Sequence, residues 1–298
     1  MARGPVVHLI DGHILVFRAY YSLPPMQAPD GTPTNAAYGF ANSLIKYLAE
    51  KRPTHIAVAF DYAMESFRNE IEPEYKANRG DTPEDLEPQF DLCARITEAL
   101  GVPAFEQQDF EADDVIATLA AQLRRKRARV VVVTTDKDLA QLVRPDGTVW
   151  LHDPGRDEPR DAAAVRAKFG VEPEQIPDYL GLVGDGVDNL PGVPGVGPRT
   201  AAAALCAFGS IERIPADPAE WSGVPIRGVA RAAAAIDGHR ERALRTRELA
   251  TVRRDVPGVR ADLRRLAYRG ADRDRVEDLF AELDWGQITT RIPKWASA

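Results

Sequence analysis

The sequence predicts an α/β fold in which a parallel-sheet core is followed by a helical C-terminal part. Three short apolar runs rich in β-branched residues, Val6–Ile10, Ile56–Phe60 and Val130–Val133, have the length and composition of buried parallel strands. Helical patterns lie between these runs, and from about Asp161 onward no strand pattern follows. Alternating strands and helices indicate a parallel sheet with right-handed crossovers.

The helices are predicted from amphipathic periodicity and from the prolines and glycines that separate them. Three fall in the first half: Ala36–Glu50, Leu86–Leu100 and Asp113–Lys126. Four fall in the second half: Ala162–Phe169, Pro173–Val183, Arg199–Phe208 and Gly228–Val252. We therefore expect an α/β core over residues 1–160 and a helical part over residues 161–298.

Composition limits the class of protein. The 298 residues are 44% hydrophobic and 28% charged, which is ordinary for a globular chain. A run of 18 apolar residues does not occur, and a strand pattern follows directly on the first residues, so we expect neither a membrane span nor a secretory signal. Cys93 and Cys206 lie in apolar helical stretches, which predicts two buried thiols, no disulfide framework and a cytoplasmic location.

The balance of charge changes along the chain. The net charge is −7, but residues 1–185 carry 20 basic and 30 acidic side chains, whereas residues 186–298 carry 18 and 15. An acidic excess can serve solubility alone, or it can mark acids that gather around metal ions and so invert the local charge. The positions of the acids decide between these interpretations.

Acidic residues follow each predicted strand. Asp11 comes after the first run, Asp61 after the second, and Asp136 and Asp138 lie just beyond the third. Because ligands bind at the carboxyl ends of the strands in open parallel sheets, these side chains should meet in one crevice. Five more acids occur at a helix start and in a glycine-containing turn: Glu111, Asp113, Asp114, Asp185 and Asp188.

Carboxylates that meet would repel one another unless cations neutralise them. Oxygen ligands with no nearby His or Cys favour Mg²⁺ or Mn²⁺ over zinc, and two such ions about 3.5–4 Å apart can hydrolyse a phosphodiester. Each acid alone has an ordinary alternative: Asp11 could be a turn residue, Asp113 could complement a helix dipole, and Asp188 could cap a helix. Acids at several strand ends favour the metal cluster.

These motifs resemble those of the 5′ nuclease family, which includes the 5′ nuclease domain of bacterial DNA polymerase I and stand-alone flap endonucleases. They occur in the family's order along nearly the whole chain, in residues 11–20, 60–61, 67–68, 74–79, 111–114, 134–138 and 184–197. The resemblance implies a PIN-like core in which one metal is held or supported by Asp11, Asp61, Glu111, Asp113 and Asp114. The second would be surrounded by Asp136, Asp138, Asp185 and Asp188, and Asp113 would face both.

The connection from Met64 to Asp85 is polar and too long for an ordinary loop in a compact domain. By the resemblance it is an arch or clamp through which a single-stranded 5′ end passes. Contacts to the scissile phosphate or its neighbours are expected from Lys76, Arg79 and Arg18, and a further DNA contact from Arg68. Stacking on unpaired bases, with core packing as an equally weighted alternative, is expected of Phe17, Tyr20 and Tyr75.

A glycine-rich segment near residues 184–208 resembles a helix-hairpin-helix element. Glycines let the backbone approach phosphates, and a following helix N-terminus offers free amides to them. The resemblance adds a K⁺ ion between this loop and a duplex. The expected DNA contacts are Gly192, Gly195, Gly197, Arg199 and Thr200. Pro198 and Arg199 replace a Glu-Lys pair common in the family; Pro suits a first helical position and Arg keeps the charge.

Together these features predict a monomeric, structure-specific 5′ nuclease of DNA replication and repair. It would use two Mg²⁺ ions, or Mn²⁺ in their place, to hydrolyse DNA that has 5′ flaps, nicks or branches, and a DNA polymerase is a candidate partner. One alternative is a ribonuclease on the related core, which would lack the arch and the hairpin. Another is a branched-DNA scaffold that has lost catalysis, which would lack acids. A third is the front end of a polymerase cut at a domain boundary.

Overall fold

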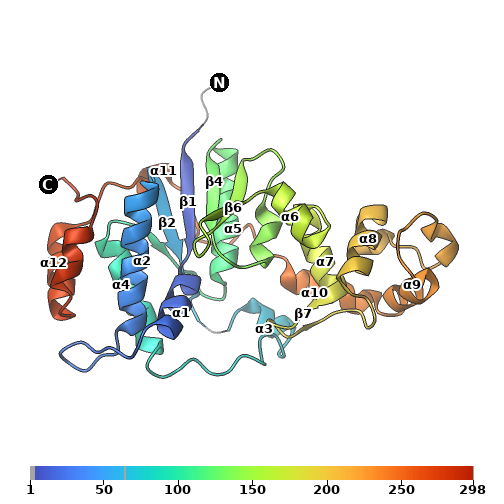
Figure 1. Ribbon diagram of the computed structural model, residues 1–298, viewed down its shortest axis with the longest axis horizontal. Coiled ribbons are helices and arrows are strands. Elements are labelled where there is room, and N and C mark those ends of the chain that lie inside the picture. Colours follow the sequence, from blue (N-terminus) through green and yellow to red (C-terminus); the bar gives the residue numbers. More distant parts are fainter. Residues whose placement is uncertain (1–3, 64, 298) are drawn as a thin grey trace. The chain divides into compact units, whose positions relative to one another are not determined.

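The computed structural model describes residues 4–63 and 65–297, and these form two compact units (Figure 1). Unit 1 comprises the described residues within 1–64, 81–135 and 254–298, and unit 2 comprises residues 65–80 and 136–253. The chain therefore enters each unit more than once. This division differs from the single boundary predicted near residue 160.

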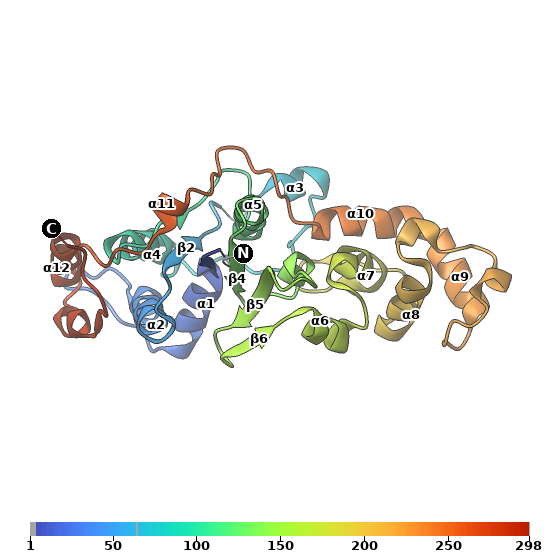
Figure 2. The ribbon, with the colours of Figure 1, turned by 90° about the horizontal axis from the view of Figure 1, so that it is seen from above.

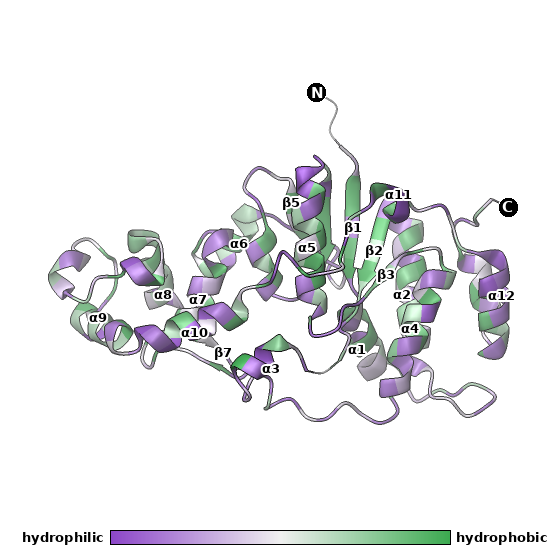
Figure 3. Cartoon of the chain, turned by 180° about the vertical axis from the view of Figure 1, so that it is seen from behind, coloured by the Kyte–Doolittle hydropathy of each residue, from purple (hydrophilic) through white to green (hydrophobic). Residues whose placement is uncertain are grey.

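Unit 1 is built on four parallel strands in the order β3-β2-β1-β4. Their bounds are β1 (Val6–Asp11), β2 (His55–Ala59), β3 (Ala104–Phe105) and β4 (Arg129–Val133). In the central strand, Leu9 lies beside Ala57 of β2 and Val132 of β4, and all three are buried. The strands accordingly appear apolar in Figure 3. The three predicted strands are confirmed to within one residue; the two-residue β3 was too short to show a pattern.

Helices cover both faces of this sheet: α1 and α2 lie on one face and α5 on the other (Figure 2). The helices of unit 1 are α1 (Gly12–Ser22), α2 (Asn35–Lys51), α4 (Glu87–Ala99), α5 (Ala112–Arg125), α11 (Leu263–Leu266) and α12 (Arg273–Glu282), with a 3₁₀ helix at Gly286–Arg291. The predictions for α2, α4 and α5 are confirmed. Helices α1, α11 and α12 were not predicted.

Residues 161–298 were expected to form the helical part, yet the described residues 254–297 belong to the sheet unit. The amide of Val256 donates to the Thr118 hydroxyl at 3.1 Å, and that of Ala261 donates to the Gln122 side chain at 2.8 Å. Both acceptors lie on α5. The amphipathic pattern of α5 predicts a helix, but it does not indicate which distant backbone amides Thr118 and Gln122 will bind.

Unit 2 is mainly helical and has two short antiparallel strand pairs. Its strands are β5 (Val149–Asp153), β6 (Glu158–Arg160), β7 (Gly184–Asp185) and β8 (Leu190–Pro191). Its helices are α3 (Phe67–Ile71), α6 (Ala162–Phe169), α7 (Ile176–Val183), α8 (Pro198–Phe208), α9 (Val229–Gly238) and α10 (Arg240–Ala250). Four 3₁₀ helices add Asp138–Leu142, Pro173–Gln175, Ile211–Arg213 and Pro218–Trp221.

Three expectations for this part of the chain need correction. Gly228–Val252 is two helices rather than one, because α9 ends at Gly238 and α10 begins at Arg240; glycine is a poor helix former. The β7–β8 pair shows that strands do not end at Asp161. Cys206 is exposed, with its thiol 3.1 Å from the Gly170 carbonyl oxygen, whereas Cys93 is buried as expected.

The search for membrane-spanning segments covered the part of the chain that the structure describes. None of its helices combines the length and the apolar character that crossing a bilayer requires.

Candidate active site

Unit 1 places its first acid where β1 ends and α1 begins. Asp11 is buried, its Oδ1 accepts the amide proton of Ile14 at 3.4 Å, and its Oδ2 accepts the hydroxyl proton of Thr134 at 3.0 Å. The next residue has to be glycine, because a Cβ at Gly12 would lie 2.5 Å from the Phe60 ring. Asp11 thus caps a helix and also lies at the carboxyl edge of the sheet, where ligand sites form.

Asp61 follows β2 at the same edge of the sheet, and a histidine lies beside it. The Asp61 carboxylate accepts the Ala112 amide proton at 2.6 Å, at the first residue of α5. The Asp61 amide donates to Nδ1 of His13 at 3.1 Å, and the His13 ring stacks on Phe90. Because Nδ1 accepts, a neutral His13 carries its proton on Nε2. The expectation that no histidine lies near the acids is therefore wrong, although the motif Asp11-Gly-His contained the signal.

The start of α5 carries the other three predicted metal ligands of unit 1, Glu111, Asp113 and Asp114. Asp114 is fully buried, and its carboxylate accepts the amide proton of Glu111 at 3.2 Å. Glu111 and Asp113 are half-buried. Negative side chains are favourable at a helix N-terminus, so the helix stabilises this group of charges. Asp114 is placed to hold the helix start, while Glu111 and Asp113 keep part of their surface open.

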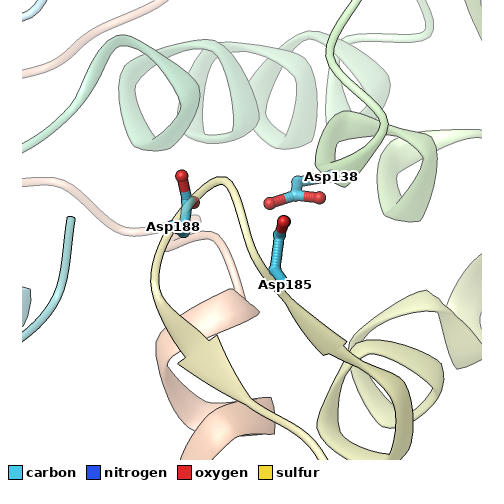
Figure 4. Close-up of side chains that lie close together, drawn as sticks. All are labelled: Asp138, Asp185 and Asp188. Atoms are coloured by element: carbon cyan, nitrogen blue, oxygen red, sulfur yellow. The ribbon is translucent and has the colours of Figure 1, made fainter. Parts of the chain in front are cut away.

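Unit 2 holds the remaining four predicted metal ligands, Asp136, Asp138, Asp185 and Asp188. Asp138, Asp185 and Asp188 are buried, and each offers a carboxylate oxygen within 4.8 Å of the others. Figure 4 shows the carboxylates of Asp138 and Asp185 pointing toward each other, with Asp188 across the hairpin loop. Asp136 lies beside them, and its Oδ1 accepts the amide proton of Asp138 at 2.8 Å. The sequence therefore predicted correctly that these acids gather.

The electrostatics of this cluster favour a bound cation. Burial, followed by the nearby charge of Asp136, raises the pKa of Asp138 well above its usual range, and burial also raises the pKa of Asp136. One buried oxygen, Oδ1 of Asp138, accepts no hydrogen bond from any described residue. Buried carboxylate oxygens, one of which accepts no hydrogen bond from a described residue, suit Mg²⁺ or Mn²⁺, which prefer oxygen ligands.

Glycines make the hairpin that carries Asp185 and Asp188 possible. Gly184 has a φ of +82°, and a Cβ there would lie 2.5 Å from the Gly192 amide nitrogen. A Cβ at Gly192 would lie 2.3 Å from the Val183 backbone. Gly192 is thus required by the packing of the hairpin on α7, which explains this glycine without a phosphate contact.

The rest of the glycine-rich segment is open. Gly195 is exposed with a φ of +80°, and Gly197 is the residue before the first turn of α8. Arg199 is exposed in that first turn, followed by the half-buried Thr200. This part of the loop keeps the features that suit a phosphate: free backbone space, a helix N-terminus and a guanidinium.

Residues 65–80, the described part of the predicted arch that lies in unit 2, pack against the hairpin. Met64 lies outside the described residues, and residues 81–85 belong to unit 1. The Arg79 guanidinium lies 2.5 Å from Oδ1 of Asp188, and the Lys76 amide donates to the Asp188 carbonyl at 3.0 Å. The Asn78 side chain donates to the Gly186 carbonyl at 2.6 Å. The Arg79 guanidinium therefore contacts the acid cluster, whereas Lys76 contacts it through its backbone and its ammonium lies over the Tyr75 ring, 5.0 Å from the centroid.

Tyr75 and Arg68 of the same segment are buried. The Tyr75 hydroxyl donates to Oδ2 of Asp188 at 3.3 Å, so packing, the alternative left open by the sequence, describes this side chain in the structure. Arg68 is 2% exposed, and its guanidinium donates to the carbonyls of Leu249 at 2.8 Å and Thr251 at 3.3 Å. It caps the C-terminus of α10, and a direct DNA contact of Arg68 has no support here.

We expect Arg68→Met to lower the free energy of unfolding by about 2–3 kcal/mol, because it leaves buried carbonyls without their charged donor. Arg253→Met is the matched control. Arg253 lies over the same Phe67 ring as Arg68 but is exposed, so its loss should cost about 0.5 kcal/mol or less. Urea unfolding curves measure both. Equal losses in the two variants would contradict the anchoring role.

Helix α1 carries the remaining predicted DNA contacts. Arg18 is exposed, Phe17 packs edge-on against Phe90, and the Tyr20 hydroxyl donates to Asp85 at 2.7 Å, which raises the pKa of Tyr20. Two exposed aromatic residues that the sequence did not single out are Tyr21, which lies on α1, and Tyr62, which follows Asp61. In the sequence, their position directly after the motifs at residues 11–20 and 60–61 could have marked them as candidate DNA contacts.

Comparison with known proteins identifies the family. Residues 6–170 match the model of the 5′-3′ exonuclease N-terminal resolvase-like domain, and residues 171–274 match that of the 5′-3′ exonuclease C-terminal SAM fold. The chain belongs to the 5′-3′ exonuclease family. The boundary between the two matches, at residues 170 and 171, differs from the division into compact units.

Individual relatives agree with this assignment. The chain is 44% identical to DNA polymerase I of Bacillus caldotenax over 286 residues, which are 95% of this chain and 32% of that protein. It thus spans about a third of the length of the curated relatives that it matches. Bacteriophage T5 5′-exonuclease with bound zinc has the same fold, with a TM-score of 0.64 and 23% identity over 82% of this chain and 89% of that one. The T5 D15 flap endonuclease in complex with DNA and metal ions gives a TM-score of 0.64 and 20% identity over 94% and 99%.

Proposed function

We propose that the chain is a structure-specific 5′ nuclease that hydrolyses DNA with 5′ flaps, nicks or free 5′ ends. The observation that carries this proposal is the buried cluster Asp138, Asp185 and Asp188, in which one carboxylate oxygen has no hydrogen-bond partner among the described residues. Membership of the 5′-3′ exonuclease family supports it, as does the likeness to a flap endonuclease solved with DNA and metal ions.

Each unit supplies one set of metal ligands in this proposal. Unit 2 would hold one Mg²⁺ or Mn²⁺ through its four acids, and unit 1 would hold the other through Asp11, Asp61, Glu111 and Asp113, with Asp114 fixing the helix start. Bound divalent ions would supply an activated water and a neutralised leaving oxygen. Of the chain's own groups, Lys76, Arg79 and Arg18 would bind the phosphates that flank the cut. The exposed Tyr21 and Tyr62 would offer faces on which unpaired bases stack.

The loop Gly195–Gly197 and the start of α8 would bind the duplex away from the cut, as a helix-hairpin-helix element with K⁺ at its carbonyls. Gly195→Val should raise the dissociation constant for duplex-containing substrates far more than for short single strands, because the side chain intrudes between amide and phosphate. Arg199→Ala should weaken binding of all sequences alike and make the salt slope shallower by about one, the loss of one phosphate contact.

Fluorescence titrations in KCl and NaCl series test this anchoring role. Arg213→Ala is the matched control, since Arg213 is an exposed arginine of the same unit outside the loop. Equal loss of affinity for single strands and duplexes would indicate a folding defect, and the anchoring role would be withdrawn.

A panel of labelled substrates tests the function itself. With Mg²⁺ present, flapped and nicked DNA should be cut near the branch or the 5′ end, and matched duplex RNA should be spared. Preferential cutting of RNA would favour the ribonuclease alternative. Tight binding of branched DNA without any cutting would favour the scaffold.

A further inference from the structure

Lys137 lies inside the acid cluster of unit 2 and connects two of its members. Its Nζ is 2.5 Å from Oδ2 of Asp185 and 3.8 Å from Oδ1 of Asp138, and its backbone lies between Asp136 and Asp138. The side chain is 33% exposed. The ammonium group therefore contacts the cluster directly while remaining able to move toward solvent.

The two carboxylate oxygens of Asp185 have different hydrogen-bond partners. Its Oδ1 accepts the Val187 amide proton at 3.0 Å, which holds the turn of the hairpin. Its Oδ2 is the oxygen that Lys137 contacts. A carboxylate oxygen can accept more than one bond, but Oδ2 is the oxygen of Asp185 that the turn does not use. A divalent ion held by Oδ2 would therefore share this oxygen with the Lys137 ammonium.

An ammonium and a divalent cation that share one carboxylate oxygen would repel each other. Two cations a few ångströms apart in a partly buried site interact by several kcal/mol at an effective dielectric constant of about 20. Lys137 is well placed to offset the mutual repulsion of Asp138 and Asp185 before metal binds. The same side chain would oppose the arriving ion.

We propose that Lys137 is a built-in counter-ion of the metal-free cluster, which a divalent ion displaces from Asp185 and which thereby sets the metal concentration at which the site fills. This inference rests on the proposed metal site of unit 2. It assigns to Lys137 a role in positioning the carboxylates and in tuning metal affinity.

Metal binding without DNA tests the proposal. Mn²⁺ is titrated by calorimetry into the wild-type protein, Lys137→Met and the control Arg213→Met. Arg213 is an exposed arginine of unit 2, so the control removes one positive charge from the same unit. Lys137→Met should bind Mn²⁺ about tenfold more tightly than wild type, a change of about 1.4 kcal/mol. Arg213→Met should bind it as wild type does.

Thermal unfolding provides the second measurement. In EDTA the melting temperature of Lys137→Met should fall below that of wild type, because Asp138 and Asp185 have lost the cation that contacts them, and saturating Mn²⁺ should restore it. Lys137→Arg, which keeps the charge, should show no gain in affinity, and Lys137→Gln provides a second neutral variant should the Met variant fold poorly.

Unchanged or weaker Mn²⁺ binding by folded neutral variants would overturn the role of Lys137 while leaving the metal site intact. Absence of Mn²⁺ binding by the wild-type protein would instead overturn the metal site itself, and the inference about Lys137 with it.

Discussion

Asp185→Asn is expected to reduce cleavage of flapped DNA by about a thousandfold, while affinity for that DNA stays within a few-fold. Asparagine can still accept the Val187 amide proton, so the hairpin keeps its turn, but the negative ligand is lost. A thousandfold corresponds to about 4 kcal/mol of activation free energy. Binding need not suffer, because the loss of a negative charge also reduces repulsion of the phosphates. Asp185→Ala and Asp136→Ala should have the same effect on cleavage.

Single-turnover rates at saturating Mg²⁺ and equilibrium binding with Ca²⁺ measure the two quantities. Glu220→Gln is the control, an exposed acid of the same unit that lies outside the cluster. Cleavage within a few-fold of wild type in both Asp185 variants would remove unit 2 from the catalytic site.

The second large effect is expected from the segment that packs on the hairpin. Lys76→Ala and Arg79→Ala should each slow the single-turnover step by about a hundredfold and change duplex affinity little, because preorganised cations stabilise charge that develops on the phosphate. Arg79 is exposed, and its guanidinium is held beside the cluster by Asp188. Arg79→Lys should recover part of the rate, since it keeps the charge but loses the planar fork.

Asn78→Ala tests whether residues 65–80 act through the charges of Lys76 and Arg79 or only through the position of the segment. Asn78 ties the same turn to the Gly186 carbonyl without carrying charge. Its loss should slow cleavage much less than the loss of Arg79. If the three alanine variants slow the reaction equally, the segment acts through its position and the two cations have no separate role.

The sequence predicted what depends on short-range pattern. Buried parallel strands are continuous apolar runs, so β1, β2 and β4 were found to within a residue, and the acids that follow them were found with them. Asp138 lies far from Asp185 and Asp188 in the chain, yet the three gather, as the resemblance to the 5′ nuclease family implied.

Long-range contacts could not be predicted in the same way. Whether Arg68 faces solvent or the carbonyls of Leu249 and Thr251 depends on residues more than 180 positions away. Exposed Cys206 and buried Cys93 have similar apolar neighbours in sequence. His13 was overlooked for a different reason. Its ring accepts the Asp61 amide proton, a contact between residues 48 positions apart that acid positions alone do not indicate.

The dependence of cleavage on Mg²⁺ shows whether the chain is a nuclease that uses two metal ions. A 5′-labelled flap substrate is cut under single-turnover conditions across a range of Mg²⁺ concentrations, with EDTA as the zero point. We expect no cleavage in EDTA, a rate that rises with Mg²⁺ below saturation with a log–log slope approaching two, and a new 5′-phosphate on the downstream product. Cleavage that persists in EDTA, or a product with a 5′-hydroxyl, would contradict it.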